Sequence, residues 1–489
     1  MMSLTALDIW AVAPEIVVAT MACLVLVVDV YTRSLQPCEL AYPLAIGTLI
    51  AGAAISLMGL YEAPQLALNG LVIRDGVADV LKTGTCLGAA AVLFYARDYA
   101  QERGLWRGEY LVLALFGVVG MMTMIGAAHL LTLYVGIELL ALCLYGMIAM
   151  ERDSVRAAEA AMKYFILGAL ASGVLLYGMS LLYGLTGSLS LVTVSQASTT
   201  LSSESLPLML AIAMVVVGLL FKLGAVPFHM WVPDVYDGSA TSTTLYLSAV
   251  PKLAAFAILL RLLFSGLGDW IEIWQDMLAV AAVLSIALGN VVAIAQTSIK
   301  RMLAYSTISN MGFLLLGFFA GTAAGYSAAM AYAVIYMVAT LAVFGVILAL
   351  TRPGFESDLL DDFRGLNERN PWLAFLMLTV MFSLAGIPPT AGFFAKLMVL
   401  QAALGSGFIE IVVVAAILAV VGAFYYLRVV KLMYFDSPQP GVLKISAQGY
   451  RRSTIWVLTA NAILLIAITP WIGKTIDFIA FSFVHLDLP

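Results

Sequence analysis

FKLGAVPFHMW, residues 221–231, interrupts an apolar run of membrane-spanning length with a glycine and a proline. A second stretch, FSLAGIPPTAGFFAK at residues 382–396, interrupts another such run in the same way. Proline inside a helix removes a hydrogen bond and frees carbonyl groups, which a bilayer tolerates only where protein or water satisfies them. The two stretches therefore predict two broken transmembrane helices, and the alternative for each is a simple packing kink.

Apolar runs of about 20 residues, enough to cross a bilayer, recur along the whole chain on both sides of these stretches. Hydrophobic residues make up 63% of the 489 positions and charged residues 11%, whereas a soluble domain needs about 25%. We therefore predict an all-α polytopic membrane protein of about fourteen transmembrane helices. The predicted spans, numbered 1 to 14, lie near 9–30, 41–61, 76–97, 108–126, 128–150, 160–186, 206–228, 239–264, 275–297, 302–321, 324–350, 371–403, 408–433 and 454–473.

The broken spans are the seventh and the twelfth, and the span after each ends in Leu-Arg, at Arg261 and Arg428. An odd period of five spans would turn the second copy upside down, as in transporters built from inverted repeats. We predict two inverted five-helix repeats on this basis. The predicted units are residues 1–107 with spans 1–3, 108–264 and 275–433 as the repeats, and 434–489 with the last span.

Basic residues gather in the loops that follow odd-numbered spans, whereas the other side has only Arg74 and Lys474. The positive-inside rule places the basic loops in the cytoplasm and both termini on the outer side. The basic loop residues are Arg33, Arg97, Arg103, Arg107, Arg152, Arg156, Lys300, Arg301, Arg352, Arg364, Arg369, Lys431, Lys444, Arg451 and Arg452.

The same composition excludes several classes of function. The net charge of −5 and the scattered basic residues give no support to nucleic-acid binding. The cysteines fall singly, with no C-x-x-C and no histidine at ligand spacing, which argues against iron–sulfur, zinc and disulfide frameworks. We therefore expect no metal and no cofactor on this chain. The four cysteines are Cys23, Cys38, Cys86 and Cys143.

Ionisable residues inside the spans are the candidate functional groups, because a charge at the bilayer centre costs about 2.5–3.5 kcal/mol. Glu138 lies deep in span 5, Lys222 at the break of span 7, Lys252 in span 8 and Lys396 after the break of span 12. A static ion pair or a side chain that reaches the interface is the alternative for these groups. Lys163 lies close to the start of span 6, where interface anchoring explains it equally well.

Lysine suits proton transfer because burial favours the neutral amine and a nearby carboxylate favours the charged one. His229 could relay protons between Lys222 and Lys252, since imidazole gains and loses protons near neutral pH, or it could simply cap the break. Span 10 contains hydroxyl and amide groups that could hold a file of water or join helices. These groups are Ser306, Thr307, Ser309 and Asn310. For Asp29, Asp79, Lys82 and Arg261, near span ends, we expect ordinary interface anchoring.

At these residues the sequence resembles the antiporter-like membrane subunits of respiratory complex I, and most closely the subunit N family of bacterial NADH-quinone oxidoreductase. The matching strings cover both halves of the chain in the expected order. They are GIEL at 136–139, FKLGAVPFHMWVPDVY at 221–236, PKLAAF at 251–256, QTSIKRMLAYSTISNMG at 296–312 and SLAGIPPTAGFFAK at 383–396. The chain departs from the family in GSATSTTLYLSAVPK at 238–252, where a proline-containing segment is usual.

The resemblance implies a proton-translocating subunit in which Glu138 pairs with Lys222, Lys252 and His229 form a central relay, and Lys396 is the exit-side group. It also implies that NADH, FMN, iron–sulfur clusters and quinone bind to partner subunits, and that the partners are other membrane and peripheral subunits of complex I, including neighbouring antiporter-like subunits. The expected location is the bacterial cytoplasmic membrane. Two other functions remain open, a subunit of a multisubunit cation/proton antiporter and a purely structural membrane scaffold.

Overall fold

The structure of the protein is a computed structural model that describes residues 5–32, 38–351, 355–438 and 452–483. The loop residues Arg33, Arg352, Lys444 and Arg451 lie outside these described residues. Within them, 12 helices are long and apolar enough to cross a membrane, or up to 13 if one bent pair counts as a single span. The predicted all-α polytopic fold is therefore confirmed.

The first half of the chain forms α1 (Ala6–Ala11), α2 (Ala13–Thr32), α3 (Ala41–Met58), β1 (Gln65–Ala67), β2 (Val72–Arg74), α4 (Gly76–Glu102), α5 (Gly108–Ile125), α6 (Leu130–Ile148), α7 (Val155–Thr186), α8 (Leu191–Gln196), η1 (Ala197–Thr199), α9 (Leu206–Leu223), α10 (Trp231–Gly238), α11 (Thr241–Ala249), α12 (Pro251–Leu259) and the π-helix η2 (Leu260–Gly266). The second half forms η3 (Gly268–Trp270), α13 (Ile271–Ile294), α14 (Ile299–Phe319), α15 (Ala323–Leu350), η4 (Leu360–Phe363), α16 (Leu366–Arg369), α17 (Pro371–Ala385), α18 (Ala391–Gly405), α19 (Ile409–Tyr434), α20 (Arg452–Ala467), η6 (Thr469–Trp471) and α21 (Ile472–Ser482).

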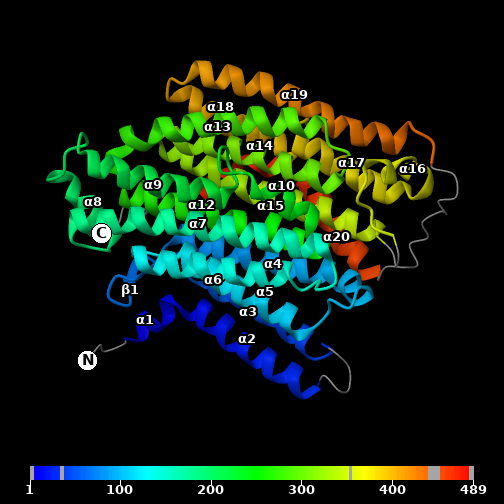
Figure 1. Ribbon diagram of the computed structural model, residues 1–489, viewed down its shortest axis with the longest axis horizontal. Coiled ribbons are helices and arrows are strands. Elements are labelled where there is room, and N and C mark those ends of the chain that lie inside the picture. Colours follow the sequence, from blue (N-terminus) through cyan, green and yellow to red (C-terminus); the bar gives the residue numbers. More distant parts are fainter. Residues whose placement is uncertain (1–4, 33–37, 352–354, 439–451, 484–489) are drawn as a thin grey trace.

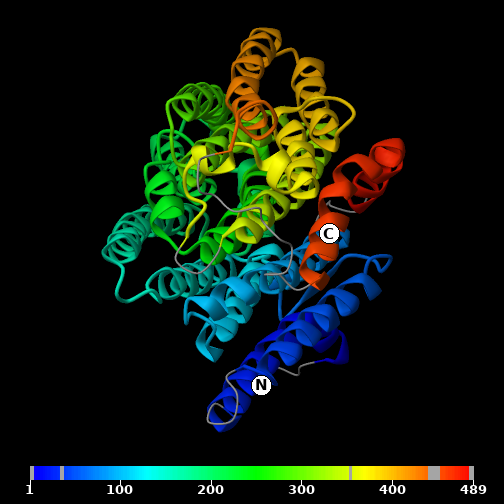
Figure 2. The same ribbon diagram turned by 90° about the vertical axis from the view of Figure 1, so that its right-hand side faces the viewer.

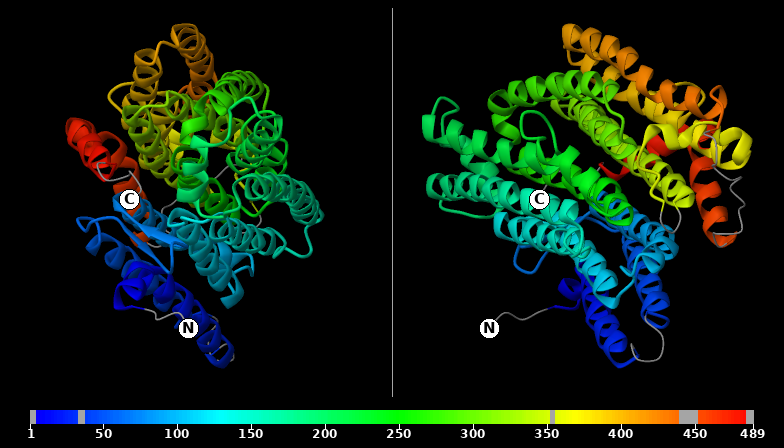
Figure 3. Two further views of the ribbon diagram at one scale, coloured as in Figure 1. Left: turned by 90° about the vertical axis from the view of Figure 1, so that its left-hand side faces the viewer. Right: turned by 45° about the vertical axis from the view of Figure 1, so that its right-hand side comes forward.

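Most of the long helices run side by side along one direction, with α2 and α3 at one edge of the stack and α18 and α19 at the other (Figure 1). Seen end-on, the C-terminal helices return toward the start of the chain, and α20 packs against α4, α15 and α17 (Figure 2). The opposite end view shows the same two edges, with α2 and α19 far apart (Figure 3). The central helices α11, α12, α14 and α15 are almost wholly buried between these edges.

The two predicted helix breaks are confirmed, and the last span has a bend that was not predicted. Span 7 ends as a helix at Leu223 and resumes as α10, and span 12 consists of the two short helices α17 and α18. The last span bends by 48° after Ala467, where Thr469 and a proline start a new helix. Between spans 2 and 3, β1 and β2 form an antiparallel hairpin that hydropathy could not predict.

Two kinds of contact occur once in the first half of the chain and once in the second half. The N-cap of α6, His129, bridges to Ser190, and the N-cap of α14, Ser298, bridges to Leu359 in the matching place. Arg261 donates to the carbonyl of Ile125 at the end of α5, 3.0 Å away. Arg428 likewise donates to Ile294 at the end of α13, 3.1 Å away. In each half, therefore, an arginine donates a hydrogen bond to a carbonyl that a helix end leaves unsatisfied.

Buried ion pairs join the N-terminal spans to one another and to the rest of the chain. The Lys82 amine, fully buried, lies 2.7 Å from Glu15 of α2. Arg261, 1% exposed, makes two hydrogen bonds of 2.6 and 2.9 Å to Asp75, which caps α4. The expectation of interface anchoring is wrong for Lys82 and Arg261, because partners remote in sequence neutralise both charges inside the protein.

We expect Arg261→Met to destabilise the protein by about 3–5 kcal/mol, because it leaves the Asp75 carboxylate buried without its counter-ion. Combining it with Asp75→Asn removes both charges and is expected to recover much of that loss. Thermal unfolding of the detergent-solubilised protein measures both. A double variant as unstable as Arg261→Met would show that packing, not the unpaired charge, causes the loss.

Candidate proton-transfer site

The break after α9 begins at a glycine whose backbone only glycine adopts without strain. Gly224 has φ +77° and caps α9, and the Ala225 amide then reaches back to the carbonyl of Leu220. The chain runs without helix from Gly224 to Met230 before α10 begins at Trp231. The carbonyl of Leu223, at the end of α9, is thus free to accept a hydrogen bond from a side chain.

The break after α17 repeats this geometry. Gly386 has φ +82° and the Ile387 amide reaches back to the carbonyl of Phe382. The chain resumes as a helix at Ala391. Two carbonyls at the end of α17, those of Leu384 and Ala385, are left to side-chain donors.

At both breaks a lysine amine donates hydrogen bonds to the freed carbonyls. The Lys252 amine, on a residue 2% exposed, donates to the carbonyl of Leu223 at 2.8 Å and lies 5.7 Å from the centre of the Trp231 ring. The Lys396 amine donates to Leu384 at 2.9 Å and to Ala385 at 3.0 Å, and lies 5.0 Å from the ring of Phe313. Each amine therefore exchanges the hydration shell it would have in water for backbone and aromatic contacts.

Lys222 and Lys252 face one cavity of about 30 Å³, which has room for water. The cavity is lined by Met124, Ile137, Leu140, Ala141, Leu144, Tyr164, Lys222, Trp231, Leu247, Pro251, Lys252 and Ala255. Glu138 of α6 is close enough for its charge to act on the Lys222 amine, yet it forms no ion pair in the described part of the chain. Its Oε1 is buried without a hydrogen-bond partner. Two amines therefore meet at one small internal space, and a carboxylate outside its lining acts on one of them.

Lys396 faces a second, smaller cavity of about 10 Å³. Its lining includes Asn310 of α14 and Tyr332 and Tyr336 of α15. The Tyr332 hydroxyl donates to the Asn310 side chain at 2.7 Å, and the Tyr336 hydroxyl donates to Thr307 at 2.7 Å. Hydroxyl groups thus approach the second lysine from α14 and α15.

Of the two interpretations of span 10, helix contact accounts for its hydroxyl and amide groups in the described structure. Ser306 bonds to the Tyr426 hydroxyl of α19 at 2.5 Å, and Asn310 and Thr307 bond to tyrosines of α15. The sequence analysis missed Tyr332, Tyr336 and Tyr426. Tyr332 and Tyr336, four apart in an apolar span, stand on one helix face and would have given the signal.

Two of the predicted site residues lie away from these cavities. Lys163 of α7 has a side chain 43% exposed and pairs with Glu159 at 2.8 Å and Asp234 at 2.7 Å. His229, in the first break, is half-buried with its Nδ1 unpartnered, but it does not line the Lys222 cavity. The structure thus brings Glu138, Lys222 and Lys252 together and leaves Lys163 and His229 at a distance from their cavity.

A family model described as NADH:quinone oxidoreductase/Mrp antiporter, TM, matches residues 127–422, which hold both broken helices. NADH-quinone oxidoreductase subunit N of Thiobacillus denitrificans is 55% identical over 445 residues, 89% of this chain and 92% of the relative. The chain belongs to the NADH-quinone oxidoreductase subunit N family. The subunit N of Methylovorus glucosotrophus is 48% identical over 98% of both chains.

Chains of two larger assemblies have the same fold as this subunit N family member. A chain of respiratory complex I from Thermus thermophilus is 30% identical, with a TM-score of 0.78, over 94% of this chain and 98% of the other. A chain of the Mrp complex from Dietzia is only 20% identical but has a TM-score of 0.83 over 98% and 97% of the two chains. The fold is therefore shared by subunit N and Mrp proteins at low identity.

The described residues of this subunit N contain no group of three His, Cys, Asp or Glu side chains placed to hold a metal ion. The chemistry available at its buried site is proton exchange between amines, a carboxylate, hydroxyls and water. A buried lysine can release its proton when the influence of a nearby carboxylate changes, which arginine cannot do. Lys222 and Lys252 share a cavity, and Glu138 supplies a charge close enough to act on Lys222, so the three have the residue types that such exchange requires.

Proposed function

We propose that this chain is the membrane-arm subunit of NADH-quinone oxidoreductase that translocates protons across the bacterial cytoplasmic membrane, driven by NADH-to-quinone electron transfer in partner subunits. One observation carries the proposal. In a member of the subunit N family, Lys222 and Lys252 face one cavity beside Glu138, whose carboxylate forms no ion pair in the described structure. The amine of Lys222 can gain or lose a proton when the influence of the Glu138 carboxylate changes.

In this proposal Glu138 controls the charge of Lys222, and Lys222 exchanges protons with Lys252 through water in their cavity. Lys396 then releases the proton on the exit side, beside the carbonyls of Leu384 and Ala385. The hydrogen-bonded tyrosines of α15 stand at the cavity of Lys396. His229 and Lys163 have no step, because neither lines the cavity between the two lysines.

The proposal extends to the surroundings of the chain. The redox cofactors, NADH, FMN, iron–sulfur clusters and quinone, belong to partner subunits, which are the other membrane and peripheral subunits of complex I. Both termini lie on the outer side, as the basic residues after odd-numbered spans indicate. Two matching pairs of contacts support two repeats at 108–264 and 275–433. The bridge His129–Ser190 matches Ser298–Leu359, and the hydrogen bond from Arg261 to Ile125 matches that from Arg428 to Ile294.

We expect Glu138→Gln to abolish NADH-driven proton uptake by inside-out membrane vesicles, because an amide cannot change the charge felt by Lys222. The complex should still assemble, since the side chain keeps its shape and makes no ion pair in the described structure. A native gel stained for NADH dehydrogenase activity checks assembly, and Glu410→Gln at the exposed start of α19 is the control. Normal proton uptake by the assembled Glu138→Gln complex would contradict the proposed function.

A further inference from the structure

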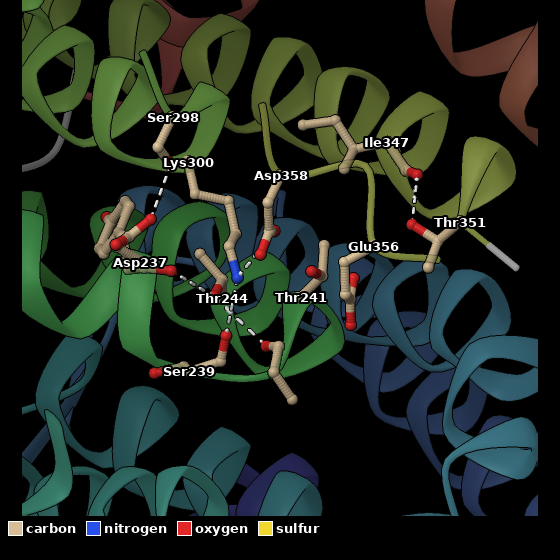
Figure 4. Close-up of polar contacts among 12 residues, drawn as sticks. Asp237, Ser239, Thr241, Thr244, Ser298, Lys300, Ile347, Thr351, Glu356 and Asp358 are labelled. Atoms are coloured by element: carbon tan, nitrogen blue, oxygen red, sulfur yellow. Dashed lines mark hydrogen bonds and ion pairs between the residues drawn. The ribbon is translucent and has the colours of Figure 1, made fainter. Parts of the chain in front are cut away.

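The loop after α15 brings two carboxylates against the start of α11 and α14 (Figure 4). Asp358 lies 3.2 Å from the amine of Lys300, which also donates to the carbonyl of Ser239 at 3.2 Å. Glu356 accepts a hydrogen bond from the Tyr99 hydroxyl at 2.8 Å and lies 2.8 Å from Arg103. Its side chain is 34% exposed, so the group meets both bulk water and the protein interior.

The backbone of this loop is fixed without any need for these charges. The Ile299 amide donates to the carbonyl of Asp358 at 2.8 Å, and Leu360 donates back to Thr297 at 2.9 Å. The matching bridge in the first half is built in the same way around Leu189, with serines beside it and no carboxylate. The backbone bridge between this loop and the start of α14 therefore does not need the carboxylates of Glu356 and Asp358.

Two buried oxygens at this loop have no hydrogen-bond partner, the Oε2 of Glu356 and the Oγ1 of Thr241. The Tyr99 hydroxyl links their residues, since it donates to Glu356 and accepts the Thr241 amide at 3.2 Å. Figure 4 shows Thr241 and Glu356 beside each other. An unsatisfied buried polar atom costs about 1–3 kcal/mol, and water is the usual partner in such places. A water bound between the loop and α11 would satisfy both oxygens.

From Thr241 a polar stripe leads inward along the helix that carries Lys252. Ser248 and Lys252 follow Thr241 at positions i+7 and i+11, which lie on one helix face. Thr241 and Ser248 are fully buried and Lys252 is 2% exposed. At 1.5 Å per residue the stripe covers about 16 Å.

We propose that Glu356 is the group through which this subunit takes up protons from the cytoplasm. Hydronium in the bulk gives its proton to the Glu356 carboxylate, on a side chain that is 34% exposed, and becomes water. The carboxylic acid then gives that proton to water held at the Thr241 hydroxyl, from which it moves along the stripe toward Lys252. Burial raises the pKa of the Glu356 carboxyl and outweighs the nearby Arg103, which lowers it, so the protonated form is accessible. This inference rests on the proposed function and adds the uptake side of its route.

The test uses the whole complex in inside-out vesicles, in which the cytoplasmic face meets the medium. Glu356→Gln keeps an acceptor for Tyr99 but cannot carry a proton, so we expect proton uptake per unit time to fall at least about tenfold. Thr241→Val removes only the hydroxyl and should have the same effect. Glu356→Asp and Thr241→Ser keep the chemistry and should restore most of the rate.

Two further variants separate proton uptake from a structural role of the loop. Arg103→Gln breaks the same ion pair but leaves the carboxylate, so a purely structural role would make it as slow as Glu356→Gln. Asp361→Asn, on a residue 55% exposed in the same segment, is the matched control and should pump normally. Proton uptake through Glu356 is excluded if the Glu356→Gln complex pumps at the normal rate. It is also excluded if the Arg103→Gln complex pumps as slowly as the Glu356→Gln complex. If Glu356→Gln pumps normally while Glu138→Gln does not, only the uptake site is wrong; if both pump normally, the proposed function itself fails.

Discussion

Lys222→Arg is expected to stop proton pumping while the complex assembles normally. The guanidinium stays protonated, so it can keep the positive charge of Lys222 but cannot pass a proton to the cavity shared with Lys252. The loss should be at least about a hundredfold, as for other positioned proton-transfer groups. NADH-driven acidification of inside-out vesicles, divided by the rate of NADH oxidation, measures it.

Lys222→Ala serves as the companion variant, because it removes both the charge and the proton carrier. If charge alone were required, arginine would pump and alanine would not. If proton transfer is required, both fail to the same degree. Coupled turnover by Lys222→Arg at the normal rate would remove Lys222 from the route, whatever the alanine variant does.

Lys396→Met is expected to have an effect of similar size. Methionine keeps an apolar stem of similar length, so packing against Phe313 survives while the amine on the carbonyls of Leu384 and Ala385 is lost. If Lys396 only filled space, the variant would pump normally. If it releases protons on the exit side, quinone-linked pumping should fall by about a hundredfold or more.

Lys396→Glu provides the control for charge sign, because a carboxylate can also take up and release a proton and should keep part of the activity. Assembly is checked first on a native gel, since a missing complex says nothing about mechanism. An assembled Lys396→Met complex with the normal ratio of protons to electrons would show that the exit-side role is wrong.

The broken helices were predictable because their causes are local. Gly224 and Gly386 stand three and two residues before prolines, and a glycine that can adopt positive φ shortly before a proline is a local signal that ends a helix. The buried lysines were equally visible, because an ammonium group in an apolar run has few alternatives to a functional role. Local chemistry thus identified both the breaks and the groups beside them.

Partners remote along the chain were not predictable. Glu356 meets Tyr99 across 257 positions, and Arg261 meets Asp75 across 186 positions, so no periodicity links them. The same holds for His229, which is close to Lys222 in sequence but does not line its cavity. Lys222 lies at the end of α9 and His229 within the break that follows, so closeness in number does not place both at one cavity.

The tight space around Lys396 has an electrical consequence. A cavity of about 10 Å³ holds at most one water, and the Lys396 amine is bound to two carbonyls at its edge. A membrane potential of 100 mV drives each charge with about 2.3 kcal/mol, so an open file of water across the subunit would short-circuit the respiratory membrane. In the proposed route, a proton would cross the second half of the subunit only when the Lys396 amine leaves the carbonyls of Leu384 and Ala385.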